Sequence, residues 1–129
     1  MDITTRLYIS YFQYLTQDLL FTTESDYPWK VVYLGANIDA MTKALPFDIA
    51  AAQKVEITHL LRNALKSQDW YGEDELKSVH KYQSLVNTLH TEVKNAIAYK
   101  FGEVEIAVYI LMELPNGEQL GLSTIAVET

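Results

Sequence analysis

The stretch that decides the fold is YKFGEVEIAVYILMELPNGEQLGLSTIAV, residues 99–127. Its apolar residues alternate with charged and smaller ones, a period of two that is typical of a β-strand with two different faces. The pattern predicts one long strand over Tyr99–Glu113, a turn at residues 114–117 and a last strand over Gln119–Val127. Asn and Gly in the turn accept a positive φ. One face of the long strand would carry Val104, Ile106, Val108, Ile110 and Met112, and the other Glu103, Glu105, Ala107, Tyr109 and Leu111.

Two amphipathic helices are predicted before these strands. Residues Asp74–Asn95 show an apolar stripe at the helical period, and three carboxylates at its start suit the positive end of the helix dipole. Its members are Leu76, Val79, Tyr82, Val86, Leu89 and Val93. Residues Asp2–Leu20 show a second stripe, made of Leu7, Tyr8, Tyr11, Phe12, Leu15 and Leu19.

The segments between the two helices are less regular. Residues 22–28 read as a loop that ends at Pro28, and Lys30–Leu34 as a strand of branched and aromatic residues. Two readings of residues 48–65 stay open: one long helix, or a strand over Lys54–Ile57 followed by a shorter helix capped by Thr58. The alternation of Val55 and Ile57 with charged residues favours the second reading.

Composition limits the possible functions. The 129 residues fit a single domain, 1–129, with 49% hydrophobic residues and a formal charge of −7 from 10 basic and 17 acidic side chains. The absence of Cys rules out disulfides, thiol catalysis and Cys-ligated zinc. Because phosphate contacts need clustered Lys and Arg, we expect no nucleic-acid binding, and without a long apolar run we expect no membrane association and a cytoplasmic location.

Catalytic signatures are missing. His59, His80 and His90 do not form a metal-binding spacing, and no phosphate-binding glycine loop or nucleophile elbow occurs. Glu103 and Glu105 could serve an enzyme as an acid/base pair, but alternating Glu is typical of the solvated face of a strand. We therefore expect no enzyme and no cofactor of its own.

Aromatic residues among acidic ones stand out instead. Trp70 and Tyr71 lie between Asp69 and Glu73, and Trp and Tyr are the residues that most often anchor protein interfaces. Trp29, which abuts the strand over Lys30–Leu34, is expected in the core. The last strand leads directly to Thr129, whose terminal carboxylate is a hard oxygen ligand for a divalent cation.

Four blocks of this sequence resemble the nuclease A inhibitor family in order and spacing. They are Leu19-Leu20-Phe21 with Glu24-Ser25-Asp26-Tyr27-Pro28; Gln68-Asp69-Trp70-Tyr71; Gly102-Glu103-Val104-Glu105-Ile106 with Val108-Tyr109; and Gly121-x-Ser123-Thr124 with Val127-Glu128-Thr129. The resemblance implies an α+β fold, a three-layer α/β/α sandwich with a mainly antiparallel central sheet, similar to pathogenesis-related proteins. Residues 35–66 depart from the family pattern.

The resemblance also implies a function: inhibition of a sugar-non-specific, Mg²⁺-dependent endonuclease that degrades DNA and RNA, in a complex of about one to one. By resemblance, Glu24 imitates a substrate phosphate, Trp70 packs at the centre of the contact, and Thr129 offers its carboxylate to the nuclease's Mg²⁺. Neighbouring Asp26, Asp69 and Tyr71 are expected in the same surface. The alternative is a protein- or ligand-binding module that shares the scaffold without inhibiting anything.

Overall fold

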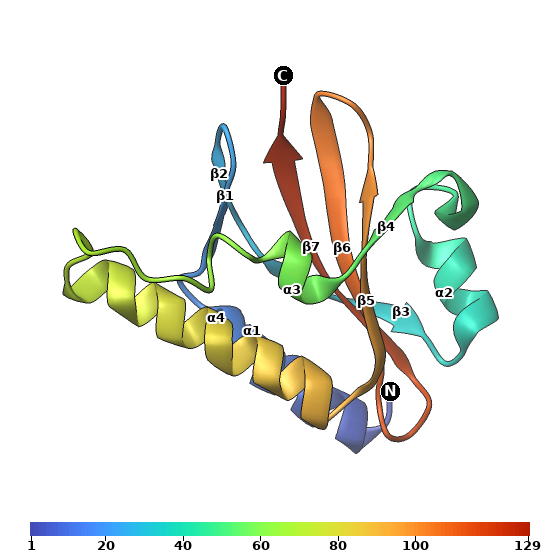
Figure 1. The fold of residues 1–129 in the computed structure, drawn as a ribbon. Coiled ribbons are helices and arrows are strands. Elements are labelled where there is room, and N and C mark those ends of the chain that lie inside the picture. The colour runs from blue at the N-terminus through green and yellow to red at the C-terminus, as the bar shows by residue number, and fades with distance from the viewer.

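A five-stranded antiparallel sheet forms the centre of the protein, which a computed structural model describes over residues 1–129 (Figure 1). The strand order is β3-β7-β6-β5-β4. The strands are β3 (Lys30–Gly35), β4 (Gln53–Val55), β5 (Lys94–Phe101), β6 (Glu105–Glu113) and β7 (Gln119–Val127). Helices pack against this sheet, so the expected mixture of helices and an antiparallel sheet is confirmed.

Strands β6 and β7 form the central hairpin that the sequence predicted. Their register runs from Glu105 opposite Val127 to Glu113 opposite Gln119. The turn between them contains Gly117 with φ 89°. Side chains on one face of β6 are buried against the main core: Ile106, Val108, Ile110 and Met112.

The prediction of one continuous strand over Tyr99–Glu113 is wrong. The chain reverses at Gly102, and β5 pairs with β6 so that Tyr99 lies opposite Tyr109. Gly102 has φ +119°, and a Cβ there would come within 2.6 Å of the Glu105 carbonyl oxygen. Only glycine fits this tight turn, and the turn leaves Val104 exposed rather than in the core.

Three helices cover the core face of the sheet: α1 (Ile3–Thr16), α3 (Ile57–Leu60) and α4 (Glu73–Thr91). Helix α4 contributes the predicted stripe as far as Leu89, although Leu76 at its exposed end is 36% accessible. The predicted end at Asn95 is wrong, because α4 ends at Thr91, Val93 follows it, and Asn95 already belongs to β5. The main core combines residues from all three helices with those of the sheet, among them Phe12, Leu15, Ile57, Leu61, Leu85 and Leu89.

Helix α1 is shorter than predicted, and its apolar stripe is only partly buried. Leu7 is 65% exposed, whereas Thr5 and Thr16 join Phe12 and Leu15 on the buried side. The buried arc of the helix is therefore rotated away from Leu7. The helix stops because the chain turns at Asp18, which has φ 63°, and then extends as a strand.

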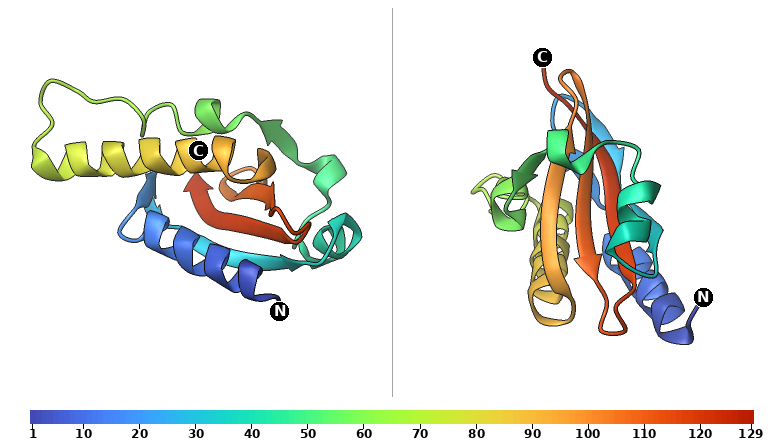
Figure 2. Two further views of the ribbon diagram at one scale, coloured as in Figure 1. Left: turned by 90° about the horizontal axis from the view of Figure 1, so that it is seen from below. Right: turned by 90° about the vertical axis from the view of Figure 1, so that its right-hand side faces the viewer.

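The opposite face of the sheet is covered by α2 (Ile38–Ala44), which the sequence analysis did not predict. A small cluster joins Met41 and Phe47 to Leu111 of β6. Figure 2 shows α4 and α2 on opposite sides of the sheet. Asn37 begins α2 by accepting a hydrogen bond from the Ala40 N–H at 2.9 Å.

The second reading of the middle segment is correct in outline. A short strand, β4, and a one-turn helix, α3, replace a single long helix, and a 3₁₀ turn, η1 (Ile49–Ala51), precedes them. The boundaries differ from the prediction, because β4 ends at Val55 and Glu56, not Thr58, occupies the helix N-cap. None of the helices is both long and apolar enough to cross a membrane.

Candidate partner-binding site

A small hairpin beside β7 carries the candidate residue Glu24; Figure 1 shows its two strands next to the end of the main sheet. Strand β1 (Leu20–Thr22) pairs with β2 (Asp26–Pro28), and Glu24 lies at the tip between them. The prediction of a loop over residues 22–28 is therefore only partly right. Tyr27 and Pro28 are extended as expected, but they pair with Phe21 and Leu20 and so complete a two-stranded ribbon.

The base of this hairpin is fixed to the core through Tyr82 of α4. The Tyr82 hydroxyl donates to the Leu20 carbonyl at 2.6 Å and accepts from the Trp29 indole N–H at 2.8 Å. Trp29 is buried, as predicted, and its ring lies 5.4 Å from that of Phe21. Burial raises the pKa of Tyr82 to about 12, although the hydrogen bond from Trp29 opposes the shift.

The tip of the hairpin is tied to the end of β7. The Val127 N–H donates to the Thr23 hydroxyl at 2.9 Å, and the Glu24 N–H donates to the Val127 carbonyl at 3.2 Å. Further down, the Thr124 hydroxyl donates to the Pro28 carbonyl at 2.9 Å. These contacts join segments about a hundred residues apart, and they hold the hairpin in one orientation relative to the sheet.

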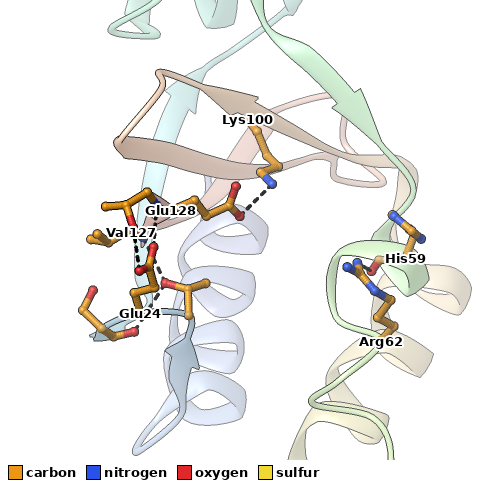
Figure 3. Close-up of polar contacts among 9 residues, drawn as sticks. Glu24, His59, Arg62, Lys100, Val127 and Glu128 are labelled. Atoms are coloured by element: carbon orange, nitrogen blue, oxygen red, sulfur yellow. Dashed lines mark hydrogen bonds and ion pairs between the residues drawn. The ribbon is translucent and has the colours of Figure 1, made fainter.

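Glu24 meets the last residue of the chain. Its carboxylate accepts the Thr129 N–H at 2.5 Å and the Thr129 hydroxyl at 2.8 Å. Beside them, Glu128 forms an ion pair with Lys100 of β5 at 3.1 Å, as Figure 3 shows. We call Glu24, Glu128 and Thr129 the acidic rim. All three are exposed, so their oxygens are accessible to a partner.

An open pocket of about 810 Å³ begins at this rim. On the far side lie His59 and Arg62, which face the acidic rim in Figure 3. The Arg62 guanidinium donates to the His59 carbonyl at 2.7 Å. Buried or half-buried apolar residues line the interior, including Phe21, Val55, Leu60, Leu61, Val79 and Tyr82.

Trp70 and Tyr71 also line this pocket, from the loop that precedes α4. Their rings meet edge to face with centroids 4.6 Å apart, and Trp70 is 75% exposed. The loop ends in a hydrogen bond from the Gly72 N–H to the Glu75 carboxylate at 3.1 Å, which begins the helix. Trp70 is thus an exposed aromatic side chain, not part of the core.

The structure brings together some of the predicted residues. Glu24 and Thr129 are in direct contact, and Trp70 and Tyr71 line the same pocket as Glu24. Asp26 and Asp69 are exposed but are not part of its lining. Glu103, at the turn before β6, and Glu105 are exposed as well.

Sequence reasoning missed the opposite wall and the ion pair of the rim. His59 and Arg62 come from residues 35–66, which the resemblance did not cover, and the wall forms where α3 packs against β5 and Gln83 of α4 donates to the Leu65 carbonyl at 3.2 Å. Lys100 meets Glu128 because β5 and β7 both flank β6. The only sequence signal for this ion pair was Lys100 as a single basic residue in a predicted strand, and such a residue does not indicate its partner.

The donors at the rim can bind a cation only in part. Nowhere do three or more His, Asp or Glu side chains gather in a way that could hold a metal ion. Both oxygens of the Glu24 carboxylate accept hydrogen bonds from Thr129, and the Glu128 carboxylate is paired with Lys100. Since Mg²⁺ takes about six oxygen ligands, these residues suit a metal that a partner already holds.

Comparison with known proteins identifies the family of this chain. A search of curated proteins gives no match. The family model described as nuclease A inhibitor-like protein matches residues 8–129 and so includes the hairpin, the Trp70 loop and the last strand. Since this match spans nearly the whole chain, the protein belongs to the nuclease A inhibitor-like family.

Proposed function

We propose that this protein inhibits a sugar-non-specific, Mg²⁺-dependent endonuclease by covering its active site in a complex of about one to one. Family membership supports a nuclease as the partner. The observation that carries the mechanism is the contact between Glu24 and Thr129 at an exposed hairpin tip. This contact holds the Glu24 carboxylate beside Thr129, whose terminal carboxylate is the second anionic group that we expect a nuclease active site to attract.

Glu24 is proposed to take the place of a substrate phosphate. An active site that cleaves nucleic acids attracts anions, and arginines can hold a carboxylate through paired hydrogen bonds. Glu24 has no cationic partner within this protein, since its carboxylate is held by Thr129 alone. The Glu24 carboxylate is therefore held in one orientation while its negative charge is not neutralised, and an arginine of the partner can neutralise it.

Thr129 is proposed to present its terminal carboxylate to the partner's Mg²⁺. A bound Mg²⁺ would supply the positive charge that a hard carboxylate oxygen prefers, and Thr129 would be the residue of this chain that touches it. The two hydrogen bonds to Glu24 orient Thr129 before the partner arrives. Binding then loses less conformational entropy than it would with a free chain end.

Trp70 is proposed as the hydrophobic anchor of the complex, with Tyr71 and Asp69 around it. An exposed indole removed from water on binding contributes a large apolar area. Tyr71 supports the ring from its edge. Asp26, the first residue of β2, would meet the partner beside Glu24, so the contact surface would extend on both sides of the pocket.

We further propose that this protein does not catalyse a reaction and does not bind nucleic acids. The formal charge of −7 repels polyanions and attracts a basic partner. Helices on both faces of the sheet support the three-layer arrangement of pathogenesis-related proteins as the fold.

The test is DNA cleavage by a Mg²⁺-dependent, sugar-non-specific endonuclease, titrated with the wild type and with Glu24→Gln. Truncating one member of a buried charge pair costs about 2–5 kcal/mol, so we expect inhibition to weaken by roughly 30-fold or more. Glu92→Gln is the matched control, because Glu92 is an exposed carboxylate at the end of α4, outside the pocket lining. A form lacking Thr129 separates the metal contact from the Glu24 contact.

Loss of potency in Glu24→Gln, with Glu92→Gln unchanged and both melting temperatures near that of the wild type, would support the mechanism. Full inhibition by both Glu24→Gln and the shortened form would refute it. A wild type that binds the nuclease without slowing cleavage would point to the non-inhibitory binding module instead.

A further inference from the structure

The pocket behind the acidic rim offers a volume and an apolar floor that take no part in the contacts proposed for Glu24 and Thr129. Its volume of about 810 Å³ is in the range of sites that enclose a drug-sized group. It extends from the hairpin, past Val55 and Leu60, to Val79 on α4. These floor residues are buried, so the pocket presents an apolar bottom below a charged opening.

The charges around this pocket are unbalanced. Four carboxylates line it, against two permanent cations and His59: Asp18, Glu24, Glu75 and Glu128 against Arg62 and Lys100. Both cations are already engaged, Lys100 with Glu128 and Arg62 with the His59 carbonyl. Since the Lys100–Glu128 contact is the single ion pair of the protein, three of the carboxylates have no cationic partner.

We propose that this pocket receives a basic segment of the nuclease, with an apolar side chain on the floor and a Lys or Arg between the unpaired carboxylates. The inference rests on the proposed function and adds a second point of contact to it. A polypeptide fits better than a free ligand because the pocket is continuous with Glu24 at one end and Trp70 at the other. One stretch of partner chain can therefore touch all three places at once.

The occupant's charge follows from the same geometry. An anionic segment would meet three uncompensated carboxylates, and juxtaposed like charges cost several kcal/mol at an interface. An apolar segment alone would desolvate those carboxylates without giving them a cationic partner. A segment with an apolar and a basic side chain can contact the apolar floor and also pair with the carboxylates at the opening.

Ser78→Trp tests the proposal by filling the pocket. Ser78 is exposed on α4 and lines the pocket, so a larger side chain there enters the space without disturbing the core. Ser84→Trp is the matched control, because Ser84 is exposed on the same helix but is outside the pocket lining. The probe is a catalytically inactive Mg²⁺-dependent, sugar-non-specific endonuclease, and the readout is its Kd by calorimetry.

We expect Ser78→Trp to weaken binding by about tenfold or more, and Ser84→Trp by less than about twofold. Asp18→Asn should weaken binding by about threefold and make it less sensitive to salt, because it removes one unpaired charge at nearly constant shape. Asn accepts the positive φ of this position, so folding is retained.

The outcomes separate the two proposals. If Glu24→Gln weakens binding but Ser78→Trp and Asp18→Asn both bind like the wild type, the pocket is not a contact site while the rim mechanism stands. If the wild type does not bind the nuclease, both proposals fail together. Weakening by Ser78→Trp with an unchanged Ser84→Trp supports the pocket as a second contact.

Discussion

Replacing Tyr82 by Phe should loosen the base of the hairpin that carries Glu24. The Tyr82 hydroxyl is the single link between the Leu20 carbonyl and the Trp29 indole, at 2.6 Å and 2.8 Å. Tyr82 is 3% exposed, so water does not readily replace the missing oxygen. Phe keeps the ring and its packing and removes these two hydrogen bonds alone.

The expected cost can be worked out from these contacts. A buried donor that loses its partner costs about 1–3 kcal/mol, which applies to the Trp29 N–H, whereas the Leu20 carbonyl is only part-buried and costs less. The hydroxyl's own desolvation is recovered, which offsets part of this cost. We therefore expect the free energy of unfolding to fall by about 1–3 kcal/mol.

Urea unfolding followed by Trp fluorescence measures this change. The control is Tyr99→Phe, because Tyr99 is half-buried on β5 and its hydroxyl makes no hydrogen bond within the protein. We expect this control to lose less than about 0.5 kcal/mol. A Tyr82→Phe protein as stable as Tyr99→Phe would show that the two hydrogen bonds do not anchor the hairpin, and the account of its orientation would be wrong.

Two further predictions concern pH and the turn before β6. Because the pKa of Tyr82 is about 12 when folded and about 10 when unfolded, its stabilising contribution is complete below pH 10 and is lost as the pH rises toward 12. The loss amounts to about 3 kcal/mol, and the urea midpoint of the wild type should fall more steeply above pH 10 than that of Tyr82→Phe; parallel curves would contradict the assignment. Gly102→Ala should cost about 2 kcal/mol or more and Gly117→Ala about 1 kcal/mol, measured by thermal unfolding. Both glycines have a positive φ, but a Cβ at Gly102 meets a carbonyl oxygen at 2.6 Å whereas one at Gly117 meets nothing within 4 Å, so equal losses would refute the steric argument.

Local patterns predicted the parts of this fold that depend on period and turn chemistry. The stripe of α4 follows from the helical period of its apolar residues, and the β6–β7 hairpin follows from alternation and from Asn116-Gly117; these signals act over a few residues. The break at Gly102 was missed because alternation continues on both sides of it, and only the steric conflict with Glu105 reveals the reversal. Leu7 was misplaced because the buried arc of its helix includes the polar residues Thr5 and Thr16, which an apolar stripe does not reveal.

The candidate site was predictable as a set of residues but not as an arrangement. Glu24, Trp70 and Thr129 came from the family resemblance, which gives no distances. Their arrangement depends on contacts between segments far apart in sequence, such as Thr23 with Val127. The wall with His59 and Arg62 could not be predicted, because it depends on how α3 and the residues after it pack against distant elements such as β5, which local patterns do not show.

The two sides of the pocket differ in how firmly they are held, and the difference matters for inhibition. The hairpin is tied to β7 by Thr23, Glu24 and Thr124 and to α4 by Tyr82, all through contacts of long range. The hydrogen bonds of the Trp70 loop are local, from the Tyr71 N–H to the Gln68 carbonyl and from the Gly72 N–H to Glu75. A rigid carboxylate loses little entropy on binding, while a locally held aromatic loop can adjust its fit to the partner surface. Under the proposed mechanism, substitutions in the hairpin should therefore alter the position of the Glu24 carboxylate, whereas substitutions around Trp70 should change which nuclease is bound.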